Sequence, residues 1–409
     1  MKNQISEFLN ERIDAGDFPS AVYLVAEKGE IVLHEALGYA VVEPERIEAK
    51  IDTIYDLASL TKPLVTGLLC AKLIERGEVE LDQIVEHYLP ELIEFGVLSK
   101  FDSLDVLISE LLTHRSAYRA WKPFYLLCDE ASADKRSEVL NLVANEIPPQ
   151  FESEVIYSDL NFLMLAGVLE KMHDENLDVI TIKQIVEPLI LRNTFFNPPK
   201  ELKGRVAASE KGNEYEKQTC IELGYLKPPA TAGGSDPQTN FMENPVATAP
   251  GSDQFRNPHS AFRTETIWGE VHDGNAYFMG GVAGHAGLFS TAEETFTIAQ
   301  QFLANYTTLL EPETCQLFRT NFTKGMNEAR SIAFQLAETP DSTAGSKMSA
   351  DSFGHLGFTG TSLWIDPTKD RVFILLTNRT HNRKLPFANI NSIRRTFHDL
   401  AIDYLDKNF

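Results

Sequence analysis

The chain has 409 residues, of which 43% are hydrophobic and 23% are charged. This composition supplies enough apolar material for a large buried core, so it excludes an intrinsically disordered chain and a marginal mini-protein. The formal net charge of -22 repels phosphate backbones and anionic membrane surfaces. We therefore expect neither a nucleic acid nor a membrane as partner.

The four cysteines, Cys70, Cys128, Cys220 and Cys315, are widely spaced along the chain. They form no CxxC pair and no spacing typical of zinc ligands, so we expect neither a disulfide framework nor a structural metal site. The opening segment MKNQISEFLNERIDAG alternates polar and apolar side chains. It lacks the continuous apolar run of a signal peptide, and we expect a cytoplasmic protein.

The first part of the chain predicts a helix, a hairpin and then a long helical region. Apolar side chains at helical spacing over 5–13 predict an amphipathic helix that ends near Gly16. The runs 21–26 and 31–36 flank a glycine-containing turn and predict a β-hairpin. Residues 63–224 favour helices and turns.

The second part begins with a long segment, 225–262, that is rich in Pro, Gly, Ser, Thr and Asn and predicts a surface loop. Ser290 and Glu293 follow as a candidate capping box at a helix start. The runs 360–367 and 371–378 predict a second hairpin, after which apolar residues over 393–401 predict a closing helix.

Strand signals thus concentrate at the two ends of the chain. We expect a single mixed α/β domain in which 1–62 and 263–409 form a largely antiparallel sheet flanked by helices. The mostly helical part, 63–224, is inserted between them.

An S-x-x-K pattern occurs twice, at Ser59 and Lys62 and at Ser132 and Lys135. On a helix this spacing places both side chains on one face, where the amine can take the hydroxyl proton. Ser132 lies in the polar run DEASADKRSE, which favours a solvated face. Ser59 lies between an extended segment and an apolar helical one, so it is the preferred nucleophile. The alternative is an N-cap serine with a surface lysine.

Two further segments offer groups for catalysis. Tyr157 precedes a helix-like run and is followed two residues later by Asp159. It is a candidate proton carrier, or else an aromatic residue that packs at a helix start. His355 and Gly357 open the C-terminal hairpin, where a glycine lets the backbone approach a ligand closely. His355 alone is equally compatible with a structural histidine.

Together these motifs resemble the serine β-lactamase and penicillin-binding-protein superfamily, especially its class C β-lactamase, DD-peptidase and family VIII carboxylesterase branch. That superfamily carries S-x-x-K, Y-x-N and K-T-G or H-T-G in this order, and here they correspond to Ser59-Leu60-Thr61-Lys62, Tyr157-Ser158-Asp159 and His355-Leu356-Gly357. LLTHRSAY (111–118) and GGVAGHAGLFSTAEE (280–294) are also similar to segments of the family.

The resemblance implies the β-lactamase/transpeptidase-like fold and a role for each motif. Ser59 would be the acylated nucleophile, Lys62 its proton acceptor and Tyr157 the group that passes a proton to the leaving group and later activates water. The backbone amides of Ser59 and Phe358 would form the oxyanion hole. The resemblance also places Asp159, His355, Gly357 and Phe358 at the substrate.

Three departures from the family pattern bear on substrate choice. Asp159 replaces an amide with a carboxylate, which favours a charged Lys62 and opposes its role as a base unless the side chain points elsewhere. Leu356 lacks the hydroxyl that helps relatives bind a β-lactam carboxylate. His355 is mostly neutral at pH 7 and replaces a permanent ammonium. The last two changes weaken recognition of an anionic substrate.

We therefore expect a serine hydrolase with a Ser59 acyl-enzyme, acting as a carboxylesterase on small esters. The alternatives are a β-lactamase or D-amino-acid-specific peptidase, an acyltransferase, and a non-hydrolytic module that binds acyl ligands. The expected partner is a small-molecule ester or amide. We expect no organic cofactor and no metal, since nothing fixes His272, Asp273 and His285 as metal ligands.

Overall fold

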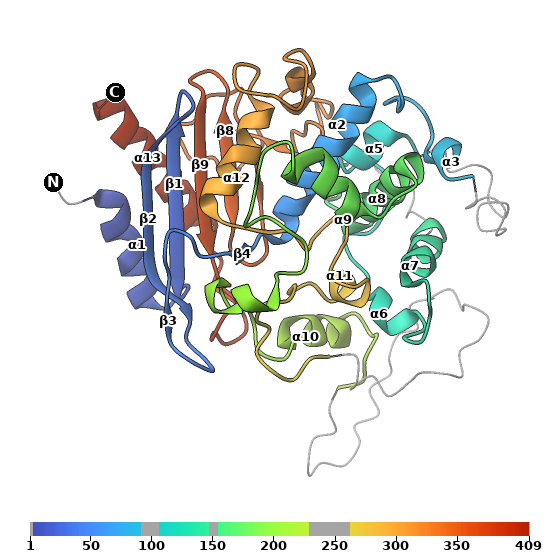
Figure 1. Cartoon of the computed structure of the whole chain (residues 1–409), viewed down its shortest axis with the longest axis horizontal. Coiled ribbons are helices and arrows are strands. Elements are labelled where there is room, and N and C mark those ends of the chain that lie inside the picture. Colours follow the sequence, from blue (N-terminus) through green and yellow to red (C-terminus); the bar gives the residue numbers. More distant parts are fainter. Residues whose placement is uncertain (1–2, 91–105, 147–153, 229–261, 409) are drawn as a thin grey trace, which may run out of the picture.

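A computed structural model describes residues 3–90, 106–146, 154–228 and 262–408. In these residues the main sheet has seven strands in the order β3-β2-β1-β9-β8-β7-β6, and all neighbouring strands are antiparallel (Figure 1). This confirms the predicted fold class. The strands are β1 (Ser20–Glu27), β2 (Glu30–Val41), β3 (Ile47–Glu48), β6 (Gln335–Leu336), β7 (Phe353–Leu356), β8 (Ser362–Asp366) and β9 (Arg371–Thr377), and a two-stranded sheet pairs β4 (Tyr55–Asp56) with β5 (Phe289–Ser290).

Both predicted hairpins are present, and they meet at the centre of the sheet. β1 pairs with β2, and β8 pairs with β9. β1 and β9 pair with each other from Ala21 opposite Thr377 to Glu27 opposite Arg371. Both strands are buried on both faces because helices cover both sides of the sheet. The two ends of the chain therefore form one continuous sheet.

Helices α1 (Gln4–Ala15) and α13 (Asn391–Asn408) cover one face of this sheet (Figure 1). Alternation along β1 turns Tyr23 and Val25 toward these helices, where they join a buried cluster with Phe397. The first helix ends at Gly16, which has a φ of +88°, a conformation that glycine adopts without steric cost. Both terminal helices match the sequence prediction.

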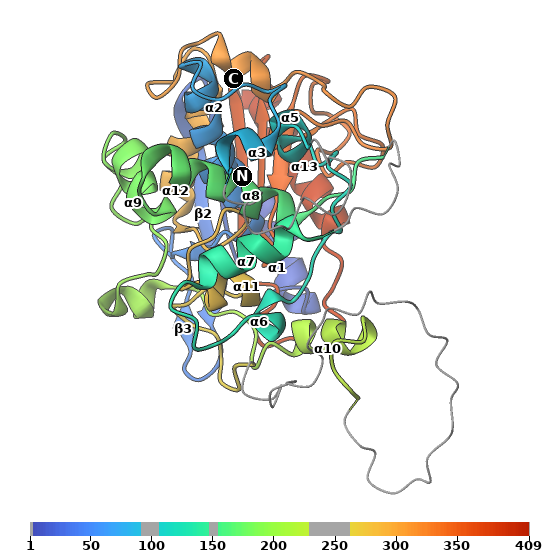
Figure 2. The ribbon, with the colours of Figure 1, turned by 90° about the vertical axis from the view of Figure 1, so that its right-hand side faces the viewer.

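The opposite face carries the helical part of the molecule, which Figure 2 shows in front of the sheet. α12 packs on β1 and β9, and the other helices lie further out (Figure 1). The α-helices are α2 (Leu68–Glu75), α3 (Val85–Tyr88), α5 (Ile108–Leu112), α6 (Phe124–Leu127), α7 (Lys135–Ala144), α8 (Asp159–His173), α9 (Leu177–Thr181), α10 (Glu214–Glu222), α11 (Gly274–Phe278) and α12 (Ala292–Ala299). The short 3-10 helices are η1 (Ala58–Leu60), η4 (Lys200–Arg205), η6 (Gln300–Phe302) and η7 (Thr314–Phe318), and η2 (Lys62–Gly67) and η3 (Ile182–Val186) are π-helices.

The predicted capping box at the start of α12 is wrong by one residue. Thr291 is the N-cap, and its side chain accepts a hydrogen bond from the N–H of Glu294. Ser290 belongs instead to β5, and its hydroxyl lies 2.7 Å from that of Thr194. Pairing of β5 with β4 keeps Ser290 extended, so the helix begins one residue later.

Most of the predicted loop 225–262 lies outside the described residues. Where the chain is described, none of the helices combines the length and the apolar composition that crossing a bilayer demands.

Candidate active site

Ser59 lies in η1, the turn that connects β4 to the buried helices η2 and α2. Ala58, the preceding residue, has a φ of +48°, which costs about 1 kcal/mol for a residue with a Cβ. Two hydrogen bonds hold this strained turn. The N–H of Ala58 donates to Asp56 Oδ1 at 2.8 Å, and Thr361 Oγ1 donates to the Leu57 carbonyl at 3.0 Å. Ser59 is thereby fixed at the edge of a pocket.

Lys62 is fully buried, and its amine has three hydrogen-bond acceptors. Nζ lies 3.0 Å from Ser59 Oγ, 2.6 Å from Asp159 Oδ1 and 3.2 Å from the carbonyl oxygen of His285. Burial by itself lowers the pKa of a lysine, but the nearby charge of Asp159 outweighs it and the Lys62 pKa is raised. Asp159 therefore points toward Lys62 and holds it as an ammonium that donates to Ser59.

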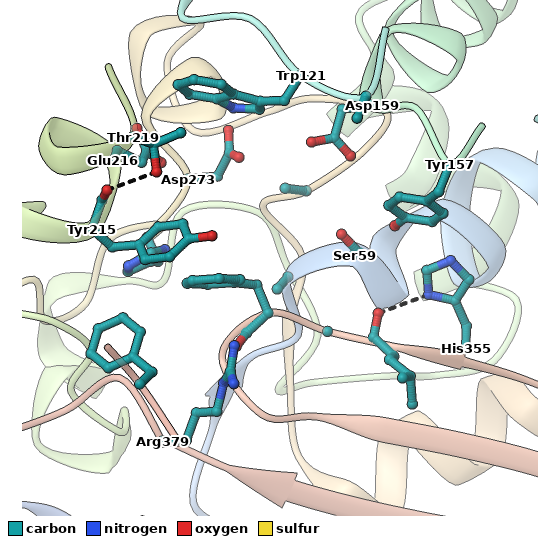
Figure 3. A pocket seen from close by; sticks show the side chains of 18 of the residues that line it. Ser59, Trp121, Tyr157, Asp159, Tyr215, Glu216, Thr219, Asp273, His355 and Arg379 are labelled. Carbon is teal, nitrogen blue, oxygen red and sulfur yellow. Dashed lines mark hydrogen bonds between the residues drawn. The ribbon is translucent and has the colours of Figure 1, made fainter. Parts of the chain in front are cut away.

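Tyr157 comes just before α8, whose first residue is Asp159. Lys62 Nζ lies 4.9 Å from the centroid of the Tyr157 ring. In Figure 3 the Tyr157 hydroxyl points toward Ser59 across the pocket. The structure thus brings together Ser59, Lys62 and Tyr157, which are far apart in the sequence, and their catalytic roles stay predictions.

The His355 side chain lies on the same side of the pocket as Tyr157, and the centroids of the two rings are 5.8 Å apart (Figure 3). Its Nδ1 lies 2.9 Å from the carbonyl oxygen of Leu356 and donates to it. Within the described residues its buried Nε2 has no hydrogen-bond partner. Burial, together with the positive charges of Lys62 and Arg330, lowers the His355 pKa well below 6.5. The ring is therefore neutral near pH 7.

Gly357 lies against the turn that carries Ser59. A Cβ at this position would lie 2.6 Å from the carbonyl oxygen of Leu57, so only glycine lets the two backbones come this close. The ring of the next residue, Phe358, packs on the His272 ring with centroids 5.4 Å apart. The backbone around Phe358 is thus held beside that of Ser59, as a two-amide oxyanion hole requires. The hole itself stays a prediction.

These residues line a pocket of about 1020 Å³ between the sheet and the helical part. Side chains of both charge signs share its wall with aromatic rings, which favours a polar substrate. The acidic residues are Asp159, Glu216, Asp273 and Glu328; the basic ones are Arg119, Arg330, Arg379 and Arg394; the aromatic ones include Trp121, Tyr157, Tyr215, Tyr225, Phe358 and Phe387.

Arg379 and Arg394 are pocket residues that the sequence reasoning missed. Arg394 donates to the carbonyl oxygens of Gly357 and Thr361 at 2.9 Å each, and Arg379 donates to that of Phe358 at 2.8 Å. In the described part of the chain neither guanidinium forms a salt bridge. Burial lowers the Arg394 pKa to about 9. An arginine in a C-terminal amphipathic helix usually lies at the surface, so the sequence carried little signal for this role.

The second S-x-x-K pattern lies elsewhere in the fold. Ser132 is in a turn before α7, and Lys135 is the first residue of that helix. Ser132 and Lys135 are therefore not on one helical face, and neither lines the pocket. This agrees with the preference for Ser59 over Ser132.

One cluster has the residue types of a metal site. Ligand atoms of Asp159, Asp273 and His285 lie within 4.8 Å of one another. His285 Nε2 is 3.0 Å from Asp273 Oδ1, and Asp273 also caps α11 through the N–H of Ala276. The Lys62 ammonium, 2.6 Å from Asp159, already supplies a positive charge there and would repel a divalent ion. These three side chains therefore do not fit a metal site. That the protein holds no metal stays a prediction.

The Beta-lactamase family model matches residues 5–395. Among curated proteins, an Escherichia coli (strain K12) protein named "Putative D-alanyl-D-alanine carboxypeptidase" is 28% identical over 395 residues, covering 93% of this chain and 82% of its own. A Bacillus subtilis (strain 168) protein named "N-acetylmuramyl-L-alanine amidase" is 28% identical over 392 residues, covering 91% of this chain and 79% of its own.

Solved structures share the fold at lower identity. EstCE1, described as a hydrolase with promiscuous acyltransferase activity, has a TM-score of 0.67 at 20% identity and 97% coverage of both chains. A class C β-lactamase from Rhodobacter sphaeroides has a TM-score of 0.64 at 16% identity, covering 99% of this chain and 100% of its own. At these identities the likeness is one of fold.

Proposed function

This chain belongs to the Beta-lactamase family of hydrolases, and on that premise we propose that it hydrolyses small carboxylic esters through an acyl-enzyme at Ser59. The contact of Ser59 Oγ with Lys62 Nζ, 3.0 Å long and at the wall of the pocket, carries this proposal. At this distance the Ser59 hydroxyl can pass its proton to the buried amine in those molecules in which Lys62 is neutral.

The proposed reaction has two steps. In the first, Ser59 Oγ attacks the ester carbonyl, its proton passes to neutral Lys62, and the C–O bond to the alcohol breaks as Tyr157 gives the alcohol a proton. In the second, water gives a proton to Tyr157 and attacks the acyl carbon, and the bond to Ser59 Oγ breaks as Lys62 returns its proton to that oxygen, which releases the carboxylic acid and restores neutral Lys62. Lys62 works as a base only in the fraction of molecules in which its amine is neutral. Activity should therefore rise with pH as this fraction grows.

A second candidate is a peptidase or β-lactamase that recognises a carboxylate in its substrate. Buried Arg394 and half-buried Arg379 favour it, because they line the pocket without an acidic partner among the described residues. An unpaired buried guanidinium gains free energy when an anion enters its site. The printed name of the Escherichia coli relative points to the same substrate class. Leu356 and neutral His355 count against it, as the sequence indicated.

The proposal is tested with p-nitrophenyl acetate and, separately, with a chromogenic cephalosporin. Product release and intact mass are followed for the wild type, for Ser59→Ala and for Ser132→Ala as the matched control. Sustained ester turnover that is lost only in Ser59→Ala is the expected result. Faster cephalosporin turnover would favour the second candidate instead.

Two other outcomes of the same assay point to different functions. A single acetylation of Ser59 without turnover would indicate the binding module. Transfer of the acetyl group to an added alcohol in preference to water would indicate the acyltransferase.

A further inference from the structure

His114 holds the backbone on both sides of Tyr157. Its carbonyl oxygen accepts a hydrogen bond from the N–H of Ile156 at 3.0 Å. Its side-chain Nδ1 accepts a second one from the N–H of Ser158 at 3.1 Å. One residue therefore fixes the amides that precede and follow Tyr157.

The His114 ring also packs directly on the Tyr157 ring, with centroids 4.6 Å apart. Phe162, one turn into α8, packs against the same histidine at 5.3 Å. His114 is only 1% exposed and has a φ of +60°. A left-handed conformation at a buried residue with a Cβ costs free energy, and it is characteristic of positions where geometry matters for function.

The protonation state of His114 follows from these contacts. Because Nδ1 accepts from the Ser158 N–H, the proton of the neutral ring is on Nε2. Asn161 Nδ2 lies 3.3 Å from the same Nδ1, and Asn161 Oδ1 is in turn bonded to the Ser116 hydroxyl. Burial is the main cause that lowers the His114 pKa well below 6.5, and the charges of Arg330 and Lys62 add to it. The acceptor at Nδ1 is therefore present at neutral pH.

We propose that His114 is a positioning residue that holds Tyr157 in place for proton transfer to the leaving group. The inference rests on the proposed Ser59 acyl-enzyme chemistry. His114 acts only through Tyr157: it fixes the two flanking amides and limits the tilt of the phenol ring. Loss of this restraint should slow the steps in which Tyr157 carries a proton more than any other step.

The test compares two esters that form the same acetyl-enzyme, p-nitrophenyl acetate and ethyl acetate. p-Nitrophenolate leaves without a proton, whereas ethoxide needs one, so only ethyl acetate depends on Tyr157 during acylation. His114→Phe keeps a ring but removes the acceptor for the Ser158 N–H. His114→Asn places Oδ1 near the position of Nδ1 and restores it. His173→Phe, at the far end of α8, is the matched control.

We expect His114→Phe to lower kcat/KM for ethyl acetate about 100-fold and for p-nitrophenyl acetate by less than about tenfold, since general-acid catalysis contributes a factor of this order. kcat/KM for ethyl acetate should be at least about tenfold higher in His114→Asn than in His114→Phe. His173→Phe should have the same kcat/KM values as the wild type. Equal losses on both esters, or no recovery in His114→Asn, would overturn the inference, because a general structural defect lowers both reactions alike.

Amide hydrogen exchange gives a readout that needs no turnover. The Ser158 N–H should exchange faster in His114→Phe than in the wild type or in His114→Asn, whereas the Ile156 N–H keeps its acceptor, the backbone carbonyl of residue 114, in every variant. If wild-type enzyme cleaved neither ester, the proposed function would be wrong, and the exchange rates would still decide whether His114 restrains Tyr157. Unchanged exchange in His114→Phe would refute the restraint.

Discussion

Replacing Asp159 with asparagine removes the charge that holds Lys62 as an ammonium. Asp159 Oδ1 lies 2.6 Å from Lys62 Nζ, and the two side chains are 17% and 0% exposed. Two unit charges at this distance attract by about 6 kcal/mol at an effective dielectric constant of about 20. The asparagine oxygen still accepts a hydrogen bond, so we assign about a quarter of this energy, about 1.5 kcal/mol, to the net loss.

The sign of the effect follows from the role of Lys62 as a base. With Asp159→Asn the Lys62 pKa falls, because burial then acts without an opposing charge. A larger fraction of the amine is neutral, and about 1.5 kcal/mol corresponds to an increase of about tenfold in kcat/KM for p-nitrophenyl acetate at pH 7. The acidic limb of the pH profile should move to lower pH, and the gain should vanish at high pH.

The assay is the pH dependence of kcat/KM for the wild type and Asp159→Asn. Asp273→Asn is the control, since it removes another pocket carboxylate that has no hydrogen bond to Lys62. Its acidic limb should move less than that of Asp159→Asn. A fall in activity of Asp159→Asn at every pH would refute the reasoning, and would show that Asp159 itself takes part in proton transfer.

Three further changes test the fold and the site. Gly357→Ala would place a Cβ 2.0 Å from Thr361 Oγ1, so kcat/KM for p-nitrophenyl acetate should fall about 100-fold as the oxyanion donors move apart; an unchanged rate would contradict this. Phe397→Ala, at a fully buried residue of α13 that packs toward the sheet, should lower the free energy of unfolding by about 3–5 kcal/mol in urea titrations. Burial lowers the His398 pKa to about 3 in the folded protein, whereas in the unfolded chain it is about 6.5. Below pH 6.5 the unfolded state therefore binds a proton on His398 that the folded state does not, and the free energy of unfolding falls as the pH is lowered. From pH 7 to pH 5 the wild type should lose about 2 kcal/mol more than His398→Gln, and equal losses would disprove this.

The hairpins and terminal helices could be predicted because their signals are local. Alternating apolar residues over 21–36 and helical spacing over 5–13 depend only on neighbours along the chain, and β1, β2 and α1 follow them closely. The start of α12 was predicted one residue too early, because pairing of β5 with β4 outweighed the propensity of Ser290 to cap a helix.

The sequence by itself determined the motifs of the site, since Ser59, Lys62 and Tyr157 stand in patterns whose order and chemistry can be read along the chain. It also indicated that the Asp159 carboxylate would favour the protonated form of Lys62 if the two side chains were in contact. Only the tertiary structure decided that they do meet, at 2.6 Å.

The tertiary structure likewise placed Arg394 beside the pocket and His114 against Tyr157. These contacts join residues of different elements, such as α13 with the end of β7 and the segment after α5 with the start of α8. No local pattern encodes such distances, because they arise when the whole chain packs its apolar faces together.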